Sequence, residues 1–477
     1  MRRTRPVVMK FGGTSVADAA AIERLVAIAR ASVERGIPTV VVVSAMSGVT
    51  DRLLSLAVTA ERREPVRQAL DALIERHRTA VAALSAEHTW RDMAPHFDDL
   101  EALLDATAIL RAASPAALDA IASAGELLSS RLVAAALDHA GIDAAWVDAR
   151  RVVVTDAQHT AAVPDAEATA MAVARDIAPI LAGGRVAVVG GFVAATASGV
   201  TTTLGRGGSD YSAALVGAAL GAGEIQIWTD VDGMLTADPR VIDHPQIVPR
   251  LSFAEASELA YFGAKVLHPS TIVPAVARNI PVRILNSRRP QGTGTLITAE
   301  GCGDRALAAV ACKRNITMVE ITSTRMLMAH GFLRRVFEVF ERFGTSVDVV
   351  TTSEVSVSVT LDDDRQAEPI AAALREFADV AVERGMAILS AVGDGLRADP
   401  RLAARLVGSL EGFAVRMVSQ AASRRNVTMV LSEADLVGAM ERLHDEFLSG
   451  CTDFRLKPEA TGDGLCLPAS AGSRSPE

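Results

Sequence analysis

A polar, glycine-rich stretch at residues 191–215, GFVAATASGVTTTLGRGGSDYSAAL, carries residue types suited to binding a small anion. It runs from a predicted strand end into a predicted helix, so it presents backbone N–H groups and the positive end of the helix dipole. Arg206 adds a planar guanidinium that fits a carboxylate or a phosphate, and Asp210 adds a negative charge beside it. The stretch predicts a site for a small anionic, zwitterionic molecule; the alternative is an ordinary strand-to-helix turn with a serine cap.

A second candidate site lies near the N-terminus, where Lys10 stands in the apolar run 7–11 directly before Gly12 and Gly13. A lysine in an apolar strand is unusual, and the glycines allow a phosphate to approach the backbone closely. The spacing is not that of a Walker GxxxxGK[ST] loop, so a different kind of phosphate site is predicted. The alternative is a lysine that protects an edge strand from aggregation.

Three further polar positions are less decisive. Glu126 stands among small residues, and its residue context alone favours a first-turn helix charge over a ligand carboxylate. The segment 229–240, TDVDGMLTADPR, suits the ribose and phosphates of a nucleotide, or else forms a charged surface turn. Lys265 either points at a phosphate or stabilises the last turn of a helix.

The elements around these residues predict an α/β fold. A strand at 7–11, a helix at 17–34 and a β-branched strand at 39–43 form a βαβ crossover, which implies a parallel sheet. Polar loops at adjacent carboxyl ends of parallel strands are where open α/β sheets bind ligands. Further strands are predicted at 185–190, 224–228 and 282–286, and residues 53–140 form a helical insertion.

Beyond residue 316 the pattern changes to shorter units that repeat as βαββαβ modules. We therefore predict a first domain at 1–298, a linker at 299–314, modules at 315–385 and 386–457, and a disordered tail at 458–477.

Composition excludes several classes of protein. The chain has 477 residues, of which 49% are hydrophobic and 22% charged, with a net charge of −9, so neither overall disorder nor a broad nucleic-acid surface is expected. It has no run of 18 apolar residues and no signal-peptide core, so no membrane partner is expected. The cysteines form no CxxC pair and have no histidine at zinc spacing, which predicts no metal site and free thiols in the cytoplasm; they are Cys302, Cys312, Cys451 and Cys466.

Five motifs, taken together and in order, resemble those of aspartate kinase (aspartokinase), of the amino-acid-kinase fold. They are KFGGTSV at 10–16, VSAMSGVT at 43–50, TTTLGRGGSDY at 201–211, the segment 227–240, and FGAKVLHP at 262–269. The C-terminal units resemble the paired ACT domains of that family. The resemblance implies a three-layer α/β domain with a mostly parallel sheet, followed by two ferredoxin-like ACT modules. It resembles the long monofunctional form, because no segment of dehydrogenase size follows residue 448.

The resemblance implies that MgATP phosphorylates the side-chain carboxylate of L-aspartate, giving 4-phospho-L-aspartate on the route to lysine, threonine and methionine. Because the carboxylate is already a nucleophile, such an enzyme mainly overcomes the repulsion of two anions and holds them in line. Lys10, the Mg²⁺ carried with ATP, and the backbone N–H groups of Gly12 and Gly13 would stabilise the transferred phosphoryl group. Asp210 would orient Lys10 and keep it protonated.

The resemblance assigns the other site residues as well. Arg206 would bind the α-carboxylate of aspartate and Glu126 its α-amino group, with Thr50, Phe192 and Ser209 lining the same pocket. The predicted ATP-binding residues are Lys10, Gly13, Thr229, Asp230, Asp238, Arg240 and Lys265. The family pattern usually has tyrosine where this chain has Leu235, which puts one nucleotide contact in doubt.

An effector site for lysine or threonine is implied in the first ACT module. Asp348 and Glu354 would accept ammonium groups, although Met328 and Ala329 depart from the polar residues expected there; the alternative is a dimer interface. The positions are Met326, Gly331, Phe332, Leu333, Ser346, Val347, Asp348, Thr352, Ser353 and Glu354. A homodimer through the ACT modules, or a tetramer, is expected. Two competing functions remain: a non-catalytic amino-acid sensor, and a kinase of another acceptor such as glutamate, acetylglutamate or uridylate.

Overall fold

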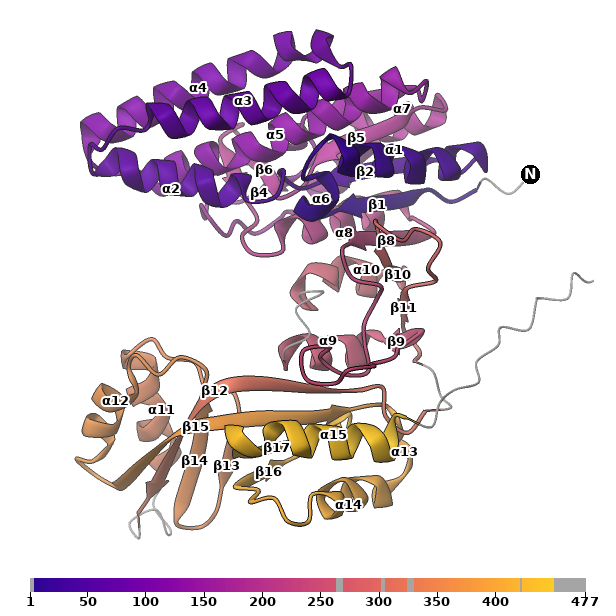
Figure 1. Cartoon of the computed structure of the whole chain (residues 1–477). Helices are drawn as coiled ribbons and strands as arrows, with labels where there is room; N and C mark the ends of the chain where they lie inside the picture. The colour runs from indigo at the N-terminus through magenta and orange to yellow at the C-terminus, as the bar shows by residue number, and fades with distance from the viewer. Residues whose placement is uncertain (1–3, 263–268, 302–304, 324–329, 421–422, 450–477) are drawn as a thin grey trace, which may run out of the picture.

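The computed structural model describes residues 4–262, 269–301, 305–323, 330–420 and 423–449. The chain forms two parts, stacked one above the other in Figure 1. The upper part is built on an eight-stranded sheet and the lower part on a six-stranded sheet. The tail predicted to be disordered, residues 458–477, lies outside the described residues, as do Lys265, Met326, Met328 and Ala329.

The eight-stranded sheet has the order β3-β5-β2-β1-β8-β10-β11-β9, and only the β10–β11 pair is antiparallel. Lys10 lies on β1, between β2 and β8, so the edge-strand interpretation of this lysine is wrong. The strands are β1 Val7–Phe11, β2 Thr39–Val43, β3 Ala144–Val147, β5 Val186–Gly190, β8 Glu224–Thr229, β9 Arg250–Ser252, β10 Val282–Asn286 and β11 Thr295–Thr298. A small second sheet contains β4 Val154–Thr155, β6 Val193–Thr196 and β7 Thr201–Thr203.

Helices cover both faces of the large sheet, because successive residues of its buried strands point to opposite sides. Val40 and Val42 pack in one core with α6, α8 and α10, whereas Val41 and Val43 pack in a second core with α1 to α5. The helices are α1 Ala19–Glu34, α2 Val49–Glu61, α3 Arg67–Ala83, α4 Trp90–Leu110, α5 Pro115–His139, α6 Ala166–Asp176, α7 Ala178–Ala182, α8 Gly208–Leu220, α9 Phe253–Tyr261 and α10 Val273–Ala277. The predicted three-layer domain with a mostly parallel sheet is therefore confirmed.

The long helix α5 runs through the middle of the upper part. Ser114 caps its N-terminus by accepting a hydrogen bond from Ala117, and Pro115 occupies its first position. By length and composition this helix alone, within the described ranges, would be able to cross a membrane. However, 89% of its apolar window is buried inside the protein, as expected of a core helix.

The lower part is an antiparallel sheet of order β13-β14-β12-β15-β17-β16 covered by helices. Its elements are β12 Ala309–Thr322, α11 Phe332–Arg342, β13 Val350–Thr352, β14 Ser356–Leu361, α12 Ala367–Leu374, β15 Asp379–Val392, α13 Gly395–Ala398, α14 Pro400–Ser409, β16 Met417–Ser419, β17 Asn426–Ser432 and α15 Leu436–Phe447. The long strands β12 and β15 belong to both halves of this sheet. Residues 309–314 of the expected linker are therefore part of β12, and the expected module boundary at 385/386 falls inside β15.

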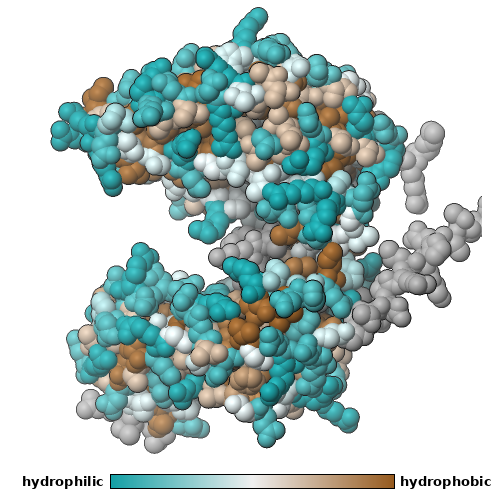
Figure 2. All heavy atoms as spheres, viewed as in Figure 1, coloured by the Kyte–Doolittle hydropathy of each residue, from teal (hydrophilic) through white to brown (hydrophobic). Residues whose placement is uncertain are grey.

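The two parts are joined by hydrogen bonds as well as by the chain. The Val310 N–H donates to the Thr236 carbonyl at 2.8 Å, and the Thr236 hydroxyl lies 3.0 Å from His444 Nε2 on α15. Glu258 on α9 accepts a bond from the Asn426 side chain at 2.7 Å. The surface in Figure 2 is mostly hydrophilic and is hollowed between the two parts.

Candidate active site

A cavity of about 510 Å³ opens at the carboxyl ends of β1, β2, β5 and β8. This is the edge at which ligands bind in open α/β sheets, so the predicted location of the site is supported. The residues that line it are Lys10, Gly12, Gly13, Thr14, Ser44, Ala45, Met46, Ser47, Gly48, Thr50, Asp51, Glu126, Phe192, Gly205, Gly207, Gly208, Ser209, Asp210, Thr229 and Asp230.

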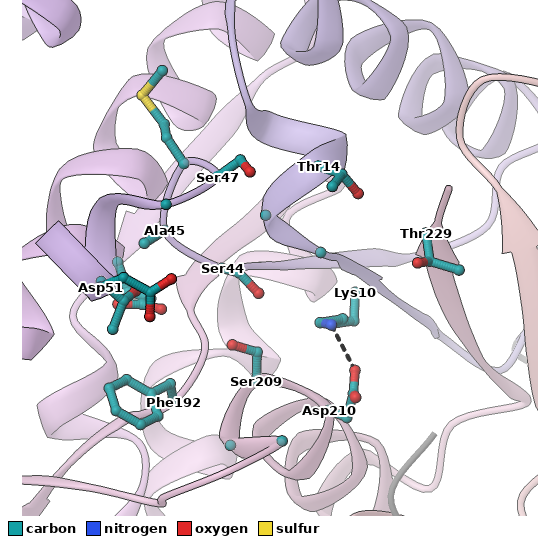
Figure 3. A pocket seen from close by; sticks show the side chains of 18 of the residues that line it. Lys10, Thr14, Ser44, Ala45, Ser47, Asp51, Phe192, Ser209, Asp210 and Thr229 are labelled. Carbon is teal, nitrogen blue, oxygen red and sulfur yellow. Dashed lines mark ion pairs between the residues drawn. The ribbon is translucent and has the colours of Figure 1, made fainter. Parts of the chain in front are cut away.

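Lys10 and Asp210 form the charged centre of this cavity. Lys10 Nζ lies 2.7 Å from Asp210 Oδ1, and both side chains are largely buried. In Figure 3, Lys10 stands between Thr229 at one end of the cavity and Ser209 and Phe192 at the other. Asp210 holds the Lys10 ammonium group in place at the wall of the cavity that both residues line. Lys10 can therefore present its positive charge to an anion in the cavity.

The two glycines after Lys10 do not have equal roles. The Gly12 N–H donates to the Trp228 carbonyl at 3.0 Å and so continues the pairing of β1 with β8. This corrects the prediction that the Gly12 N–H stabilises a phosphoryl group, because that donor is already used. Gly13 begins a short 3₁₀ turn, and its N–H has no acceptor in the part of the chain that the structure describes. Gly13 is therefore the donor that remains for an anion.

Two helices begin at the cavity wall. Gly48, in the left-handed conformation at φ +73°, is the N-cap of α2, and Gly207, at φ +72°, is the N-cap of α8. Both glycines line the cavity, so two helix N-termini direct their positive dipole ends toward it. Together with Lys10 they make the cavity favourable for negative charge.

Glu126 supplies an acidic group to the same cavity. It lies in the middle of α5 and is only 3% exposed, so the interpretation as a first-turn helix charge is wrong. Burial raises the pKa of its carboxyl group to about 8, although a backbone hydrogen bond from Ala45 and the charge of Lys10 act to lower the pKa. Its Oε2 has no hydrogen-bond partner among the described residues. A buried, unsatisfied carboxylate at a cavity wall is suited to binding a ligand ammonium.

The glycine-rich stretch at residues 191–215, here called the substrate loop, closes the cavity from the other side. Phe192 adopts a positive φ of +63°, which is unusual for an aromatic residue, and lines the cavity with Ser209. Arg206 is exposed and is not one of the cavity-lining residues, although Gly205 and Gly207 on either side of it are. The structure thus brings Thr50, Glu126, Phe192 and Ser209 together and leaves Arg206 at the rim.

A second cavity, of about 360 Å³, adjoins the first and shares Thr229 and Asp230 with it. It is lined by Asp238, Arg240 and mainly apolar residues, including Leu235. Asp238 and Arg240 form a forked pair, with Arg240 Nη2 at 2.6 Å from Asp238 Oδ2. An apolar cavity bordered by a Thr-Asp strand end and an arginine has the composition that a nucleotide base and its phosphates require.

The predicted effector residues that the structure describes lie at several separate places in the ACT part. The side chain of Asp348 is only 8% exposed, and it accepts hydrogen bonds from Lys313 Nζ at 2.9 Å and from the Tyr261 hydroxyl at 3.0 Å. Burial and the negative charge of Asp348 raise the pKa of Tyr261 to about 12. Ser346 lines a separate cavity, and Glu354 is exposed in the turn between β13 and β14. The remaining described positions are Gly331 and Phe332 at the start of α11, exposed Leu333, half-buried Val347, and Thr352 and Ser353 at the end of β13.

Comparisons with known proteins agree with this geometry. The amino acid kinase family model matches residues 5–286, and an ACT domain model matches residues 389–447. The chain is 37% identical to the lysine-sensitive aspartokinase 3 of Escherichia coli over 92% of this chain and 98% of the relative. The chain belongs to the aspartokinase family. This confirms the resemblance that was drawn from the five motifs.

Other members of the aspartokinase family are similar along most of the chain. The chloroplastic aspartokinase 3 of Arabidopsis thaliana is 38% identical over 92% of this chain and 81% of the relative. The crystal structure of Escherichia coli aspartokinase III with lysine and aspartate superimposes with a TM-score of 0.80 at 36% identity, covering 93% of this chain and 99% of the other. The structure of the same enzyme with aspartate and ADP gives a TM-score of 0.77 at 37% identity, covering 92% and 99%.

Several cavity residues were not singled out from the sequence, among them Thr14, Ser47 and Asp51. Asp51 is the third residue of α2, and an acidic residue in a first helical turn usually indicates only helix stabilisation. The polar loop after β2 was the available signal, but it did not show which of its side chains face the cavity.

Gly191 provides a test of how tightly the substrate loop is packed. A Cβ at this position would lie 2.7 Å from Ser209 Cβ and 2.8 Å from Ser209 Cα, so Gly191→Ala must displace the start of α8 and with it Asp210. We expect turnover to fall by about a hundredfold, because displacements near 1 Å in such sites have effects of this size. Gly408→Ala is the matched control, since no atom lies within 4 Å of the added Cβ. Wild-type turnover in Gly191→Ala would contradict the packing described here.

Proposed function

We propose that the chain is an aspartate kinase that transfers the γ-phosphoryl group of MgATP to the side-chain carboxylate of L-aspartate. The product is 4-phospho-L-aspartate, and the reaction begins the route to lysine, threonine and methionine. The observation that carries the proposal is the placement of Lys10, Asp210 and Glu126 around one cavity in a member of the aspartokinase family. A crystal structure of the Escherichia coli relative contains aspartate and ADP, which supports the same pair of ligands here.

The aspartate molecule is bound through its two charged α groups. The Glu126 carboxylate accepts the α-ammonium group, and Arg206 moves in from the rim to pair with the α-carboxylate. This leaves the side-chain carboxylate near Lys10 and the Gly13 N–H, where two anions must come together. Lys10 and the α8 N-terminus reduce the repulsion between them, and they stabilise charge on the phosphoryl group in the transition state.

The nucleotide occupies the second cavity, with its phosphates directed toward Lys10 and Gly13. Thr229, Asp230, Asp238 and Arg240 contact it, and Lys265, outside the described residues, is expected to contribute to the same site. Magnesium enters with ATP as part of the substrate; within the described residues no group of three or more His, Cys, Asp or Glu side chains is arranged to hold a metal ion. Leu235 supplies an apolar wall in place of the usual tyrosine.

Arg240→Ala tests the nucleotide site. Loss of a charge-assisted contact to a phosphate is expected to raise the KM for ATP about tenfold, while the KM for aspartate changes by less than about twofold. Arg365→Ala is a matched control, because Arg365 forms the same forked pair with Asp363, two residues earlier, and lies far from the cavity in sequence and fold. Equal effects of the two substitutions on the KM for ATP would contradict a contact between Arg240 and the nucleotide.

Regulation by an amino acid through the ACT part is proposed as well, since the Escherichia coli relative is named lysine-sensitive. An effector ammonium that reaches Asp348 must replace or join the Lys313 ammonium that already lies there, and Asp348 Oδ2 is buried without a partner among the described residues. A homodimer through the ACT modules, or a tetramer, is part of the proposal. So is a cytoplasmic location, which agrees with the free thiol of Cys312.

A substrate panel with the full-length chain tests the proposal. ADP formation is followed with aspartate, glutamate, acetylglutamate and uridylate as acceptors, each with and without lysine and threonine. Of the four acceptors, we expect only aspartate to support formation of ADP. We expect addition of lysine to lower the rate of ADP formation with aspartate. Turnover with another acceptor would change the substrate, and no turnover with any acceptor would favour the non-catalytic sensor.

A further inference from the structure

The structure contains a buried carboxylate outside the active-site cavity that braces the substrate loop. Asp119 lies on α5, two helical turns before Glu126, and is only 1% exposed. Its oxygens accept hydrogen bonds from Thr203 Oγ1 at 2.5 Å and from the Thr160 N–H at 3.0 and 3.1 Å. His159 Nδ1 lies 2.6 Å from its Oδ2. Asp119 therefore connects α5 to two separate segments of the chain.

Both of these segments support the turn that leads into α8. Thr203 is the last residue of β7 and is followed by Leu204, Gly205 and Arg206. The Thr203 carbonyl accepts a bond from the Ala162 N–H at 2.9 Å, which ties the segment 156–163 to β7. A Cβ at Gly205 would lie 3.2 Å from the Thr160 carbonyl, so this segment packs directly under the Gly205 turn.

The turn under which Asp119 lies also determines the geometry of the catalytic centre. Gly205 and Gly207 line the cavity, Gly207 caps α8, and α8 carries Ser209 and Asp210 in its first turn. The same helix α5 that carries Asp119 carries Glu126 at the cavity wall. A carboxylate fixed on α5 and bonded to the substrate loop thus sets the distance between the two groups that bind the ligand's α-ammonium and α-carboxylate.

We propose that Asp119 is a positioning residue for the substrate: through Thr203 and Thr160 it holds the Arg206-bearing turn at a fixed distance from Glu126. The inference rests on the proposed function, because it takes Arg206 and Glu126 as the groups that bind the two charged ends of aspartate. Asp119 touches neither substrate. Its loss should therefore weaken binding of aspartate and leave binding of ATP, on the other side of Lys10, unchanged.

A pair of substitutions at Thr203 tests this with little risk to folding. Thr203→Val keeps the shape of the side chain but removes the bond to Asp119, whereas Thr203→Ser keeps the hydroxyl. We expect Thr203→Val to raise the KM for aspartate about tenfold, the effect of one charge-assisted hydrogen bond, with the KM for ATP within about twofold of wild type. Thr203→Ser should restore a KM for aspartate close to that of wild type. Asp119→Asn should act in the same direction as Thr203→Val.

The neighbouring Thr202→Val is the matched control. Thr202 lies on the same strand, and its hydroxyl pairs with that of Thr155 at 2.7 Å without touching Asp119. If Asp119 had a merely structural role, Thr203→Val and Asp119→Asn would lower the melting temperature and change both KM values alike, or change neither KM value. Either result would overturn the proposal. So would equal effects of Thr203→Val and Thr202→Val on the KM for aspartate.

Amide hydrogen exchange separates this proposal from the proposed function. In the full-length protein without substrate, the amides of residues 204–210 should exchange faster in Thr203→Val than in Thr203→Ser. Unchanged exchange would overturn the bracing role whatever the substrate is. Faster exchange in a chain that does not phosphorylate aspartate would overturn the proposed function and leave the bracing role standing.

Discussion

Replacing Lys10 with alanine is expected to abolish formation of ADP in the presence of aspartate, with kcat lowered by about a thousandfold or more. Lys10 is the buried cation of the first cavity, 2.7 Å from Asp210, and no other lysine among the described residues lines this cavity or the adjoining one. Without it, the two anionic reactants would meet in the cavity without the buried ammonium group that offsets their repulsion. Steady-state kinetics at saturating ATP and aspartate measure the loss.

Lys313→Ala is the matched control for Lys10→Ala. Lys313 is also a partly buried lysine that pairs with an aspartate, at 2.9 Å from Asp348, but it lies in the ACT part. We expect this variant to retain its basal activity in the absence of an effector. Circular dichroism and thermal melting should show both variants folded. Substantial kcat in a folded Lys10→Ala variant would be incompatible with the proposed role of this residue.

The second large effect concerns Glu126 and pH. Because the pKa of its carboxyl group in the ligand-free protein is about 8, the group is mostly neutral at pH 7 and charged above pH 8. Only the charged form attracts an ammonium group. We therefore expect kcat/KM for aspartate to rise up to tenfold per pH unit below about pH 8 and to level off above it, since kcat/KM reports ionisation of the free enzyme. Glu126→Gln should have a low kcat/KM for aspartate without this rise.

A rise in pH that increases kcat/KM through Glu126 should at the same time lower the stability of the fold. Its pKa in the folded protein is raised above the usual value of 4.5, so between pH 4.5 and 8 the folded state retains a proton that the unfolded state has lost. The free energy of unfolding therefore decreases as pH rises through this interval. Glu126→Gln removes this loss, and above pH 8 it should be more stable than wild type by on the order of a few kcal/mol. Chemical denaturation at pH 5 and pH 9 measures the difference, and an equally stable or less stable variant at pH 9 would contradict the burial of an unsatisfied carboxylate.

The parallel core and the location of the site were predictable from the sequence for a physical reason. Strands such as 39–43 are continuous β-branched runs, and their polar ends must converge at one edge of a parallel sheet. The position of β1 inside the sheet was not predictable from Lys10 itself, because a lysine next to glycines is compatible with an edge strand as well. Its pairing with β8, more than 200 residues away in the sequence, places β1 inside the sheet.

The roles of single residues depended on contacts that spacing does not reveal. Glu126 has the local sequence of a helix charge, and only the approach of α5 to the loop after β2, through Gly125 against Ala45, places it at the cavity. The Gly12 N–H was expected to face a phosphate but is used by Trp228. Asp119 gave no signal in the sequence, because its partners Thr160 and Thr203 are distant along the chain.

The most direct test of the central claim is to trap the phosphorylated product. Full-length chain, MgATP, L-aspartate and hydroxylamine are incubated together, and aspartyl β-hydroxamate and ADP are quantified in the same sample. The proposed chemistry predicts one hydroxamate for each ADP, with neither product formed by Lys10→Ala. Formation of ADP without hydroxamate, or of hydroxamate from glutamate in preference to aspartate, would contradict it.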